Sequence, residues 1–377
     1  MKTMSFCSIV LRPCLLIGLA LVAQGGGPLQ AATTEGNLSR TFAVNPGGRL
    51  IIDADRGSID IATSDRSDVQ VEVKRKVSRE SAARGAEILA AHEVTFDQDG
   101  DLVAIRAKAK PAAAGWFNRG TQHLQVEYHV LAPRRFNLEL RTAAGEIVSS
   151  DIEGTVKART AAGSLKFGNI KGSFDGETAA GEIHLESASG RVTAESSAGS
   201  IRLGEVDGIT SATTAAGSIS VGKANASLTA KTSGGSIEVG DCAGPAQLQT
   251  AAGSIRVKSA RARLDANTSG GSITIDDAQD TVLGRTAAGS ISASFSAQPH
   301  EDCRLTTAGG GIEIKLADKL AFDVEARTSG GEVSTELPIV STVVGRPHAG
   351  VLQGKLNGGG KTLLLKTSAG DISLKRL

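Results

Sequence analysis

Glycine recurs in this chain every 18 residues, over eight consecutive steps without a slip. Such a fixed period is typical of a solenoid, in which each repeat buries its apolar side only against its neighbours. A weaker period of nine, with glycine also at positions 154, 172, 190, 208 and 244, divides each repeat into two similar segments. The nine repeat-turn glycines, to which we assign a structural role, are Gly145, Gly163, Gly181, Gly199, Gly217, Gly235, Gly253, Gly271 and Gly289.

Within each repeat, apolar or small residues alternate with polar ones. In residues 154–171 they fall at Val156, Ala158 and Thr160, and then at Leu165 and Phe167. A period of two indicates strands with one buried face. Later repeats place isoleucine at the position of Leu165, and threonine or serine at that of Thr160. Stacked at the ~4.8 Å strand spacing, these equivalents predict ladders of like residues.

The sequence motif around the glycine, as in TAAGSI or TSGGSI, predicts a tight corner of the coil. We expect its glycine to adopt a positive φ and its threonine hydroxyl to bond along the ladder or back to the turn. The serine after the glycine would form an outward ladder that serves the turn. Left-handed hexapeptide helices also use 18 residues per coil, but with a period of six. A calcium β-roll needs aspartate where this chain has Ile237 and Ile273, so we expect no calcium.

Composition limits the core and the partners. Aromatic residues make up only 3% of the chain, which favours a thin core of small side chains. The formal net charge of +1 gives no indication of a nucleic acid or a membrane surface as partner.

Residues 1–32 have the pattern of a cleaved secretory signal. Lys2 and Arg12 precede the ten-residue apolar run 14–23, and small residues follow at 30–32. Ten apolar residues are too few to span a bilayer, although a buried N-terminal helix is the alternative. Neither Cys7 nor Cys14 has the context of a lipoprotein signal. No second apolar run approaches transmembrane length, so we expect no transmembrane segment in the mature chain.

Export would permit a disulfide between the two remaining cysteines, Cys242 and Cys303. More than three coils separate them, which is roughly 15 Å along the solenoid axis. Because a disulfide needs Cα atoms within about 7 Å, both are predicted to be free core cysteines.

The pattern divides the rest of the chain into three parts. Residues 33–140 are predicted to form an N-terminal cap and irregular opening rungs, with strands at 68–77, 101–109 and 123–132 and a short helix over residues 78–91 capped by Ser78. Residues 141–300 are the regular repeats, and residues 301–377 are looser C-terminal rungs. Within the last part, residues 337–360 leave the repeat and form either a cap over the exposed end of the solenoid or a binding loop.

Few residues are candidates for a binding or catalytic site. Trp116 and Phe117, in the loop 111–120, are either an exposed contact for a sugar or protein, or a plug over the open end of the core. The histidines are scattered without metal-ligand spacing, and no catalytic residue, metal or cofactor is predicted. They are His92, His123, His129, His184, His300 and His348. Outward charges from Lys157 to Asn267 alternate in sign without a lasting carboxylate cluster.

These motifs resemble a known family. A secretory signal, the pattern F-x-V-x-P-G-G at residues 42–48, Y-x-V-x-A-P at residues 128–133 and the repeated T-x-x-G-x-I turns are similar to the bacterial putative adhesin family, over roughly residues 40–377. The resemblance implies a single-stranded β-helix-like solenoid of unknown function at the cell envelope, with no established catalytic residues.

Together these observations predict an all-β fold: a single-stranded β-helix or β-solenoid with 18-residue turns of two short strands each, a short N-terminal helix and end caps. The predicted function is that of an exported, non-enzymatic adhesin or structural or binding element, in the periplasm or at the cell surface, which contacts an unknown protein or glycan. Two alternatives stay open: a glycan-acting β-helix enzyme that uses residues 111–120 or 337–360, and a periplasmic scaffold or sensor.

Overall fold

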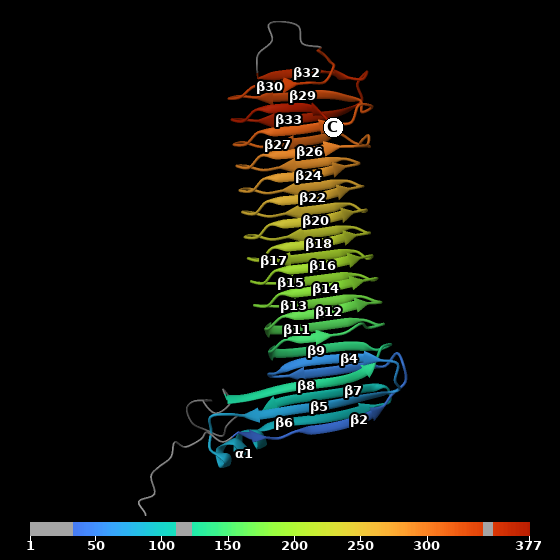
Figure 1. Ribbon diagram of the computed structural model, residues 1–377, viewed down its shortest axis with the longest axis vertical. Helices are drawn as coiled ribbons and strands as arrows, with labels where there is room; N and C mark the ends of the chain where they lie inside the picture. Colours follow the sequence, from blue (N-terminus) through green and yellow to red (C-terminus); the bar gives the residue numbers. More distant parts are fainter. Residues whose placement is uncertain (1–32, 111–122, 342–349) are drawn as a thin grey trace, which may run out of the picture.

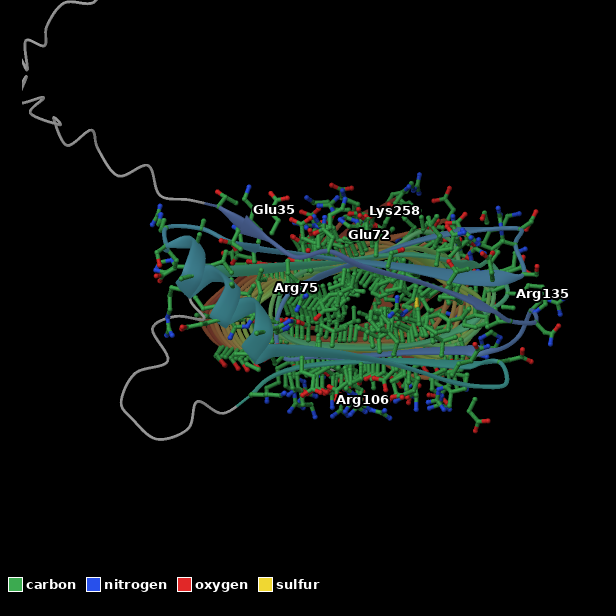
Figure 2. All side chains as sticks on the ribbon, turned by 90° about the horizontal axis from the view of Figure 1, so that it is seen from below. Glu35, Glu72, Arg75, Arg106, Arg135 and Lys258 are labelled. Carbon is green, nitrogen blue, oxygen red and sulfur yellow. The ribbon has the colours of Figure 1, made fainter. Side chains whose placement is uncertain are left out.

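A computed structural model describes residues 33–110, 123–341 and 350–377, and it forms a long column of stacked rungs (Figure 1). Each regular rung contributes one strand to sheet A and one to sheet B. Seen down the column, the two sheets face each other across a flat core, and the charged side chains lie outside (Figure 2). The predicted all-β solenoid with two strands per coil is therefore confirmed.

In the regular part, sequence order and spatial order coincide, and each strand pairs in parallel with its equivalent one repeat later. The strands of sheet A are β10 (Ile147–Ser149), β12 (Leu165–Ile170), β14 (Ile183–Ala188), β16 (Ile201–Val206), β18 (Ile219–Ala224), β20 (Ile237–Cys242), β22 (Ile255–Ala260), β24 (Ile273–Ala278), β26 (Ile291–Phe295) and β28 (Ile312–Leu316). The strands of sheet B are β9 (Asn137–Ala144), β11 (Val156–Ala162), β13 (Phe174–Thr178), β15 (Val192–Ser196), β17 (Thr210–Thr214), β19 (Leu228–Lys231), β21 (Ala246–Gln249), β23 (Leu264–Asn267), β25 (Val282–Arg285) and β27 (Cys303–Thr306).

The core is thin because the two sheets bury side chains of different size. Sheet A supplies an isoleucine ladder, in which Ile201, Ile219 and Ile237 are in register and fully buried. Opposite it, sheet B supplies small residues such as Ala212 and Ala230. At roughly 25 cal/mol per Å² of apolar surface removed from water, stacked ladders of this kind supply the main stabilisation.

The repeated turn is held by hydrogen bonds between successive rungs. The Thr232 hydroxyl donates to the Gly217 carbonyl oxygen (2.8 Å) and accepts from the Gly235 N–H (3.3 Å). The Ser236 N–H donates to the Ser218 hydroxyl oxygen one rung earlier (3.2 Å). The threonine and serine ladders therefore satisfy backbone groups at each corner, as the turn chemistry predicts.

Glycine is required at the repeated turns for a reason other than the one predicted. Of the nine repeat-turn glycines, only Gly145 and Gly163 have a positive φ, at 146° and 159°. The limit is space: a Cβ on Gly235 would lie 2.1 Å from the Gly217 carbonyl oxygen. Glycine is required here because stacked turns touch backbone to backbone, and a positive φ is not a general feature of these turns.

At the N-terminal end the rungs are not in sequence order. The rung of β3 (Arg49–Ala54) and β4 (Ser58–Ser64) lies between the later rung of β7 (Leu102–Ala109) and β8 (Leu124–Pro133) and the rung of β9 and β10. Beyond it, β5 (Asp68–Val77) pairs antiparallel with β8, and β6 (His92–Asp99) with β7. The strands β1 (Thr34–Glu35) and β2 (Leu38–Ala43) complete sheet A against β5.

Helix α1 (Ala82–Ala91) lies at this end of the column (Figure 1). Its N-cap is Ser81, whose hydroxyl accepts from the Arg84 N–H, so the predicted start at Ser78 was wrong by one turn. Arg75 holds the other end of the helix, because its guanidinium donates to the Leu89 and His92 carbonyl oxygens (3.1 and 2.9 Å). A cation at a helix C-terminus is favourable.

The C-terminal end repeats this departure from sequence order. The last rung of the chain, β33 (Lys361–Thr367) and β34 (Ile372–Arg376), lies between the rung of β27 and β28 and the earlier rung of β29 (Phe322–Thr328) and β30 (Val333–Thr335). Next to β29 in sheet B, β32 (Val351–Leu356) and then β31 (Ile339–Ser341) are added antiparallel. Both therefore lie within the predicted insertion 337–360, at the end of sheet B.

Cys242 and Cys303 are buried and unpaired, as predicted. The predicted secretory signal lies outside the described residues. Across the described part of the chain, no helix has the length and apolar character needed to cross a bilayer.

Candidate binding groove on sheet B

Over most of its length the outer face of sheet B is polar and partly self-paired. Arg159, for example, lies 3.3 Å from Glu177 and 3.9 Å from Asp175 on the next strand. The first outward position of the successive strands from β11 to β23 is occupied by Lys157, Asp175, Thr193, Ser211, Thr229, Gln247 and Asp265. This is the ordinary pattern of a solvated strand face.

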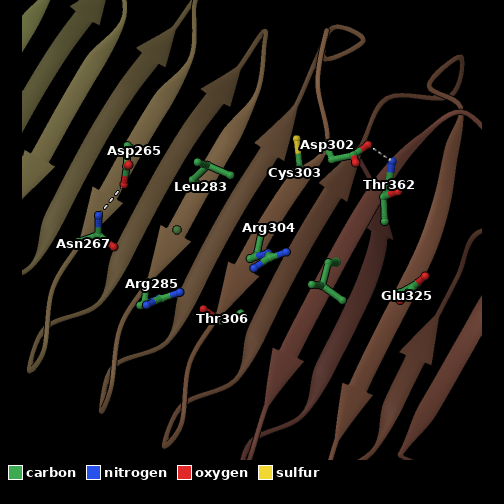
Figure 3. A pocket seen from close by; sticks show the side chains of 12 residues that line it. Asp265, Asn267, Leu283, Arg285, Asp302, Cys303, Arg304, Thr306, Glu325 and Thr362 are labelled. Atoms are coloured by element: carbon green, nitrogen blue, oxygen red, sulfur yellow. Dashed lines mark hydrogen bonds between the residues drawn. The ribbon is translucent and has the colours of Figure 1, made fainter.

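The pattern changes at the next strands. Leu283 on β25 and Leu364 on β33 occupy the same outward row and are half-buried, and Arg304 on β27 is in register between them. Here the surface is hollowed into a groove of about 600 Å³ (Figure 3). Its other lining residues are Asp265, Asn267, Gly284, Arg285, Asp302, Cys303, Thr306, Glu325 and Thr362. The groove thus combines two outward leucines with a mainly polar and charged lining.

Four successive strands at the groove each carry one exposed cation on the outer face. They are Arg285 on β25, Arg304 on β27, Lys366 on β33 and Arg327 on β29, and the register of these strands places them on adjacent rungs. Figure 3 shows Arg285 and Arg304 on neighbouring strands. Arg285 and Arg304 line the groove, whereas Lys366 and Arg327 stand beside it on β33 and β29, which also contribute lining residues.

Three acids, Asp265, Asp302 and Glu325, line the same groove, but unlike Arg159 none of the four cations lies within ion-pair distance of an acid that the structure describes. Within the described ranges no ion pair or side-chain hydrogen bond is formed by any of the four. Arginine presents a planar set of donors that suits carboxylate and phosphate groups. Arg285 and Arg304 therefore present guanidinium donors beside the acids of the groove, with a leucine on either side of Arg304.

The carboxylates of the groove border it. The Asp302 carboxylate accepts a hydrogen bond from the Thr362 backbone N–H (2.8 Å), and that of Asp265 accepts one from the Asn267 side chain (2.5 Å). Both bonds are visible in Figure 3. Glu325 lies on β29, in register with Leu364. The acids thus lie around the cation row and are partly occupied.

Cys303 lies beneath the groove and offers no nucleophile. It is buried, and burial raises the pKa of its thiol to about 11. Its sulfur accepts a contact from the Val282 N–H (3.5 Å). At neutral pH the group is a thiol rather than the reactive thiolate.

A second polar cluster lies buried in the N-terminal rungs. His92 and Tyr128 are 2% and 0% exposed, and His92 Nε2 lies 3.5 Å from Asp55 Oδ1. Neither histidine nitrogen nor the Tyr128 hydroxyl has a hydrogen-bond partner among the described residues. Burial lowers the pKa of His92 and raises that of Tyr128, with the nearby Asp55 acting to raise both. Buried groups of this kind usually bond ordered water.

The sequence-based candidates do not form a site. Trp116 and Phe117 lie outside the described residues, and the repeat-turn glycines belong to the corners of the coil. Several histidines pair singly with acids, as His184 does with Glu186 (2.9 Å) and His300 with Asp280 (3.1 Å). In the parts of the chain that the structure describes, no three histidine, cysteine or acidic residues lie close enough to hold a metal ion.

The arginines of the groove were not found from the sequence. One signal was available, since Leu283 breaks the polar outward pattern that ends at Asp265 and Asn267. The position of Lys366 could not be predicted in this way, because nothing in the repeat indicates that it lies between the rungs of Arg304 and Arg327.

Comparison with known proteins gives a domain match over part of the chain but no named activity. Residues 213–375 match the model of the family described as Toastrack DUF4097. No curated protein matches the chain. Among solved structures, a putative cell adhesion protein from Clostridium sporogenes is 10% identical, with 91% of this chain and 100% of that chain covered and a TM-score of 0.18.

Two further solved structures are similarly distant. A putative lipid binding protein from Parabacteroides distasonis is 15% identical, with 74% of this chain and 96% of that chain covered and a TM-score of 0.34. A putative adhesin from Bacteroides fragilis is 10% identical, with 91% and 97% covered and a TM-score of 0.22. The resemblance read from the turn motifs is confirmed by the family match, and residues 213–375 carry a Toastrack DUF4097 domain, a β-strand-repeat domain of unknown function.

Proposed function

We propose that the mature chain is an exported, non-enzymatic binding element of the bacterial cell envelope, and that its ligand lies in the groove on the outer face of sheet B. The pattern of residues 1–32 supports export. The rungs offer a straight and rigid surface, because successive strands are in register over most of the column. Solenoids commonly use such extended surfaces for binding.

One observation carries the proposal: the groove on sheet B departs from the outer face around it. Two half-buried leucines occupy outward positions, and the arginine between them has no acidic partner among the described residues. A surface patch that exposes both apolar area and unpaired charge favours a binding partner that covers both.

The same groove favours binding over catalysis. Hydrolysis of a glycan would need two carboxyl groups that converge on one bond, one of them kept protonated. Asp265 and Asp302 are instead each hydrogen-bonded to a neighbour, and they are offset: Asp265 is in register with Leu283, whereas Asp302 directly precedes β27. The thiol of Cys303 is buried below them.

Two measurements test the proposal together. Host cells would be treated with protease before and after outer-membrane permeabilisation, and the mature chain followed by antibody. In parallel, residues 33–377 would be mixed with purified envelope fractions and sedimented. We expect digestion in one of the two protease conditions and co-sedimentation with the envelope. Protein found in the cytoplasm, or release of soluble glycan fragments by the pure protein, would overturn the proposal. Capture of one stoichiometric protein partner would favour the scaffold alternative.

A further inference from the structure

We infer that the groove and its cation row bind a linear polyuronate, a polysaccharide with one carboxylate on each sugar unit. This inference rests on the proposed binding function and adds its ligand class. Its basis is the arrangement of four unpaired cations on four adjacent rungs, together with the two outward leucines.

The spacing of the cations fits a polymer with regularly repeated charge. Adjacent strands lie ~4.8 Å apart, so the row presents one cation at each such step along the column. That step is close to the length of one pyranose unit in an extended chain. Four successive uronates can therefore each meet Arg285, Arg304, Lys366 or Arg327, which stand on consecutive strands in that order.

The sideways placement of the cations also fits. Arg304 occupies the first outward row of sheet B, whereas Arg285 and Lys366 on the strands either side of it occupy the second row. The two rows lie two residues apart along a strand, which is about 6.6 Å. In an extended β-1,4-linked chain the carboxylates project alternately to the two edges. Arg285, Arg304 and Lys366 follow the same alternation, whereas Arg327 shares the second row with Lys366.

The leucines supply the second half of the site. Leu283 and Leu364 flank Arg304 in its own row and are half-buried, so they form flat apolar areas between the charges. The C–H faces of sugar rings can pack on such areas while the carboxylates bond the arginines.

A nucleic acid fits the row less well. Single strands are bound mainly by aromatic side chains on which bases stack, and no aromatic residue lines the groove. The chain as a whole has a formal net charge of only +1, without the broad basic field typical of nucleic-acid proteins.

The test is a calorimetric titration of residues 33–377 with β-1,4-linked mannuronate oligomers of two to six units. Cello-oligosaccharides of equal length, with the same linkage and no carboxylate, are the neutral probe. We expect affinity for the mannuronates to rise up to about four units, one per cation-bearing rung, and then to level off. The cello-oligosaccharides should bind far more weakly. Affinity should fall with added salt.

Single substitutions test whether the cations of the row bind the oligomer. Removing one charge-assisted contact with Arg304→Gln should weaken binding of the mannuronate tetramer about 10-fold or more. Lys366→Gln should have a smaller effect in the same direction, because lysine bonds a carboxylate through one point charge. The matched control is Arg159→Gln, which removes an arginine from the same face of sheet B at an ion-paired position and should leave the affinity unchanged. Thermal unfolding would show that each variant folds.

The outcomes separate this inference from the function on which it rests. Equal binding of a single-stranded oligonucleotide of matched charge, or no loss of affinity in Arg304→Gln, would overturn the polyuronate site. If the chain sediments with envelope fractions but binds no mannuronate, the inference fails and the proposed function stands. If the chain binds neither envelope nor oligomer, both fail.

Discussion

The middle of the column and its two ends use the same rung in different ways. From β11 to β26 each rung contacts the rungs that directly precede and follow it in sequence. At the ends, the rung of β3 and β4 and the rung of β33 and β34 lie between segments far from them in sequence. The middle is built from local contacts, whereas each end is closed by a segment that returns from elsewhere in the chain.

This difference is relevant to function as well as to stability. In the middle, outward residues of sheet B are polar, and pairs such as Arg159 and Glu177 neutralise each other. The cation row appears only where the last rung is inserted, because Lys366 then stands between the rungs of Arg304 and Arg327. The four predictions below test this contrast, from the largest expected effect to the smallest.

Ending the chain at residue 360 should unfold the C-terminal rungs. The truncation removes an internal rung, and with it Leu363, Leu365, Ile372 and Leu374, which are almost fully buried. Each such side chain contributes roughly 1.5–3 kcal/mol when buried. Limited proteolysis followed by mass spectrometry should show new cleavage between residues 303 and 335, while the rungs from β11 to β21 stay protected.

Deletion of one regular repeat is the control for that truncation. Removing residues 218–235 joins Gly217 to Ser236, which restores the same turn phrase and lets neighbouring rungs close up. We expect a folded protein that is one rung shorter, since repeats depend mainly on their nearest neighbours. If the truncated chain kept native protection while the repeat deletion unfolded, our contrast between ends and middle would be wrong.

Adjacent glycines of one turn should respond very differently to alanine. A Cβ on Gly235 would lie 2.1 Å from the Gly217 carbonyl oxygen, whereas one on Gly234 would lie 3.2 Å from the Ala216 carbonyl oxygen. Gly235→Ala should lower the free energy of unfolding by about 2–3 kcal/mol, because backbone must move to admit the methyl group. Gly234→Ala should change it by less than about 1 kcal/mol. Urea unfolding of both variants measures the difference, and equal values would contradict the backbone-contact explanation.

Replacing a threonine of the ladder should cost less than overcrowding the turn. Thr232→Val keeps the shape but loses the bond to the Gly217 carbonyl oxygen and the one from the Gly235 N–H. We expect a loss of about 1–2 kcal/mol in the same urea experiment, since two backbone groups lose a partner near the surface. An outward substitution in the neighbouring strand, Thr229→Val, is the control and should be close to neutral.

Acidification should weaken the N-terminal end through His92. Burial lowers the pKa of this side chain, with Arg75 and Arg56 acting in the same direction and Asp55 opposing them. A base with a lowered pKa binds its proton more readily in the unfolded chain, so stability is lost as the pH falls below the unfolded value of about 6.5. The melting temperature should therefore drop between pH 7 and pH 5, and the drop should be smaller in His92→Gln.

The exposed histidine His184, which pairs with Glu186 on the outer face of sheet A, is the control for the acid effect. His184→Gln should retain the pH dependence of the parent protein. An identical melting profile for the parent and His92→Gln across this range would show that His92 does not couple the cap to pH.

Much of the regular fold could be predicted from the sequence because each position of the repeat has the same surroundings, buried or exposed, in every rung. Period-two alternation identified the strands, and the strand predicted at residues 68–77 is β5. The helix was located, but its start was misplaced because Ser78 and Ser81 both have the character of an N-cap and the local pattern does not choose between them. The glycine of the turn was assigned the wrong reason, since stacking of backbones between rungs is not visible in one repeat.

The sequence by itself determined the solenoid, the number of strands per coil, the inward ladders and the separation of Cys242 from Cys303, because all of these follow from a fixed period and its alternation. Only the tertiary structure decided the order of the rungs at the ends, since the entropic cost of pairing two strands grows only slowly with the length of chain between them. That order places Lys366 beside the arginines of the groove, and it brings His92, Asp55 and Tyr128 together in the buried core. The surface chemistry of this protein is therefore set by how the chain closes its ends.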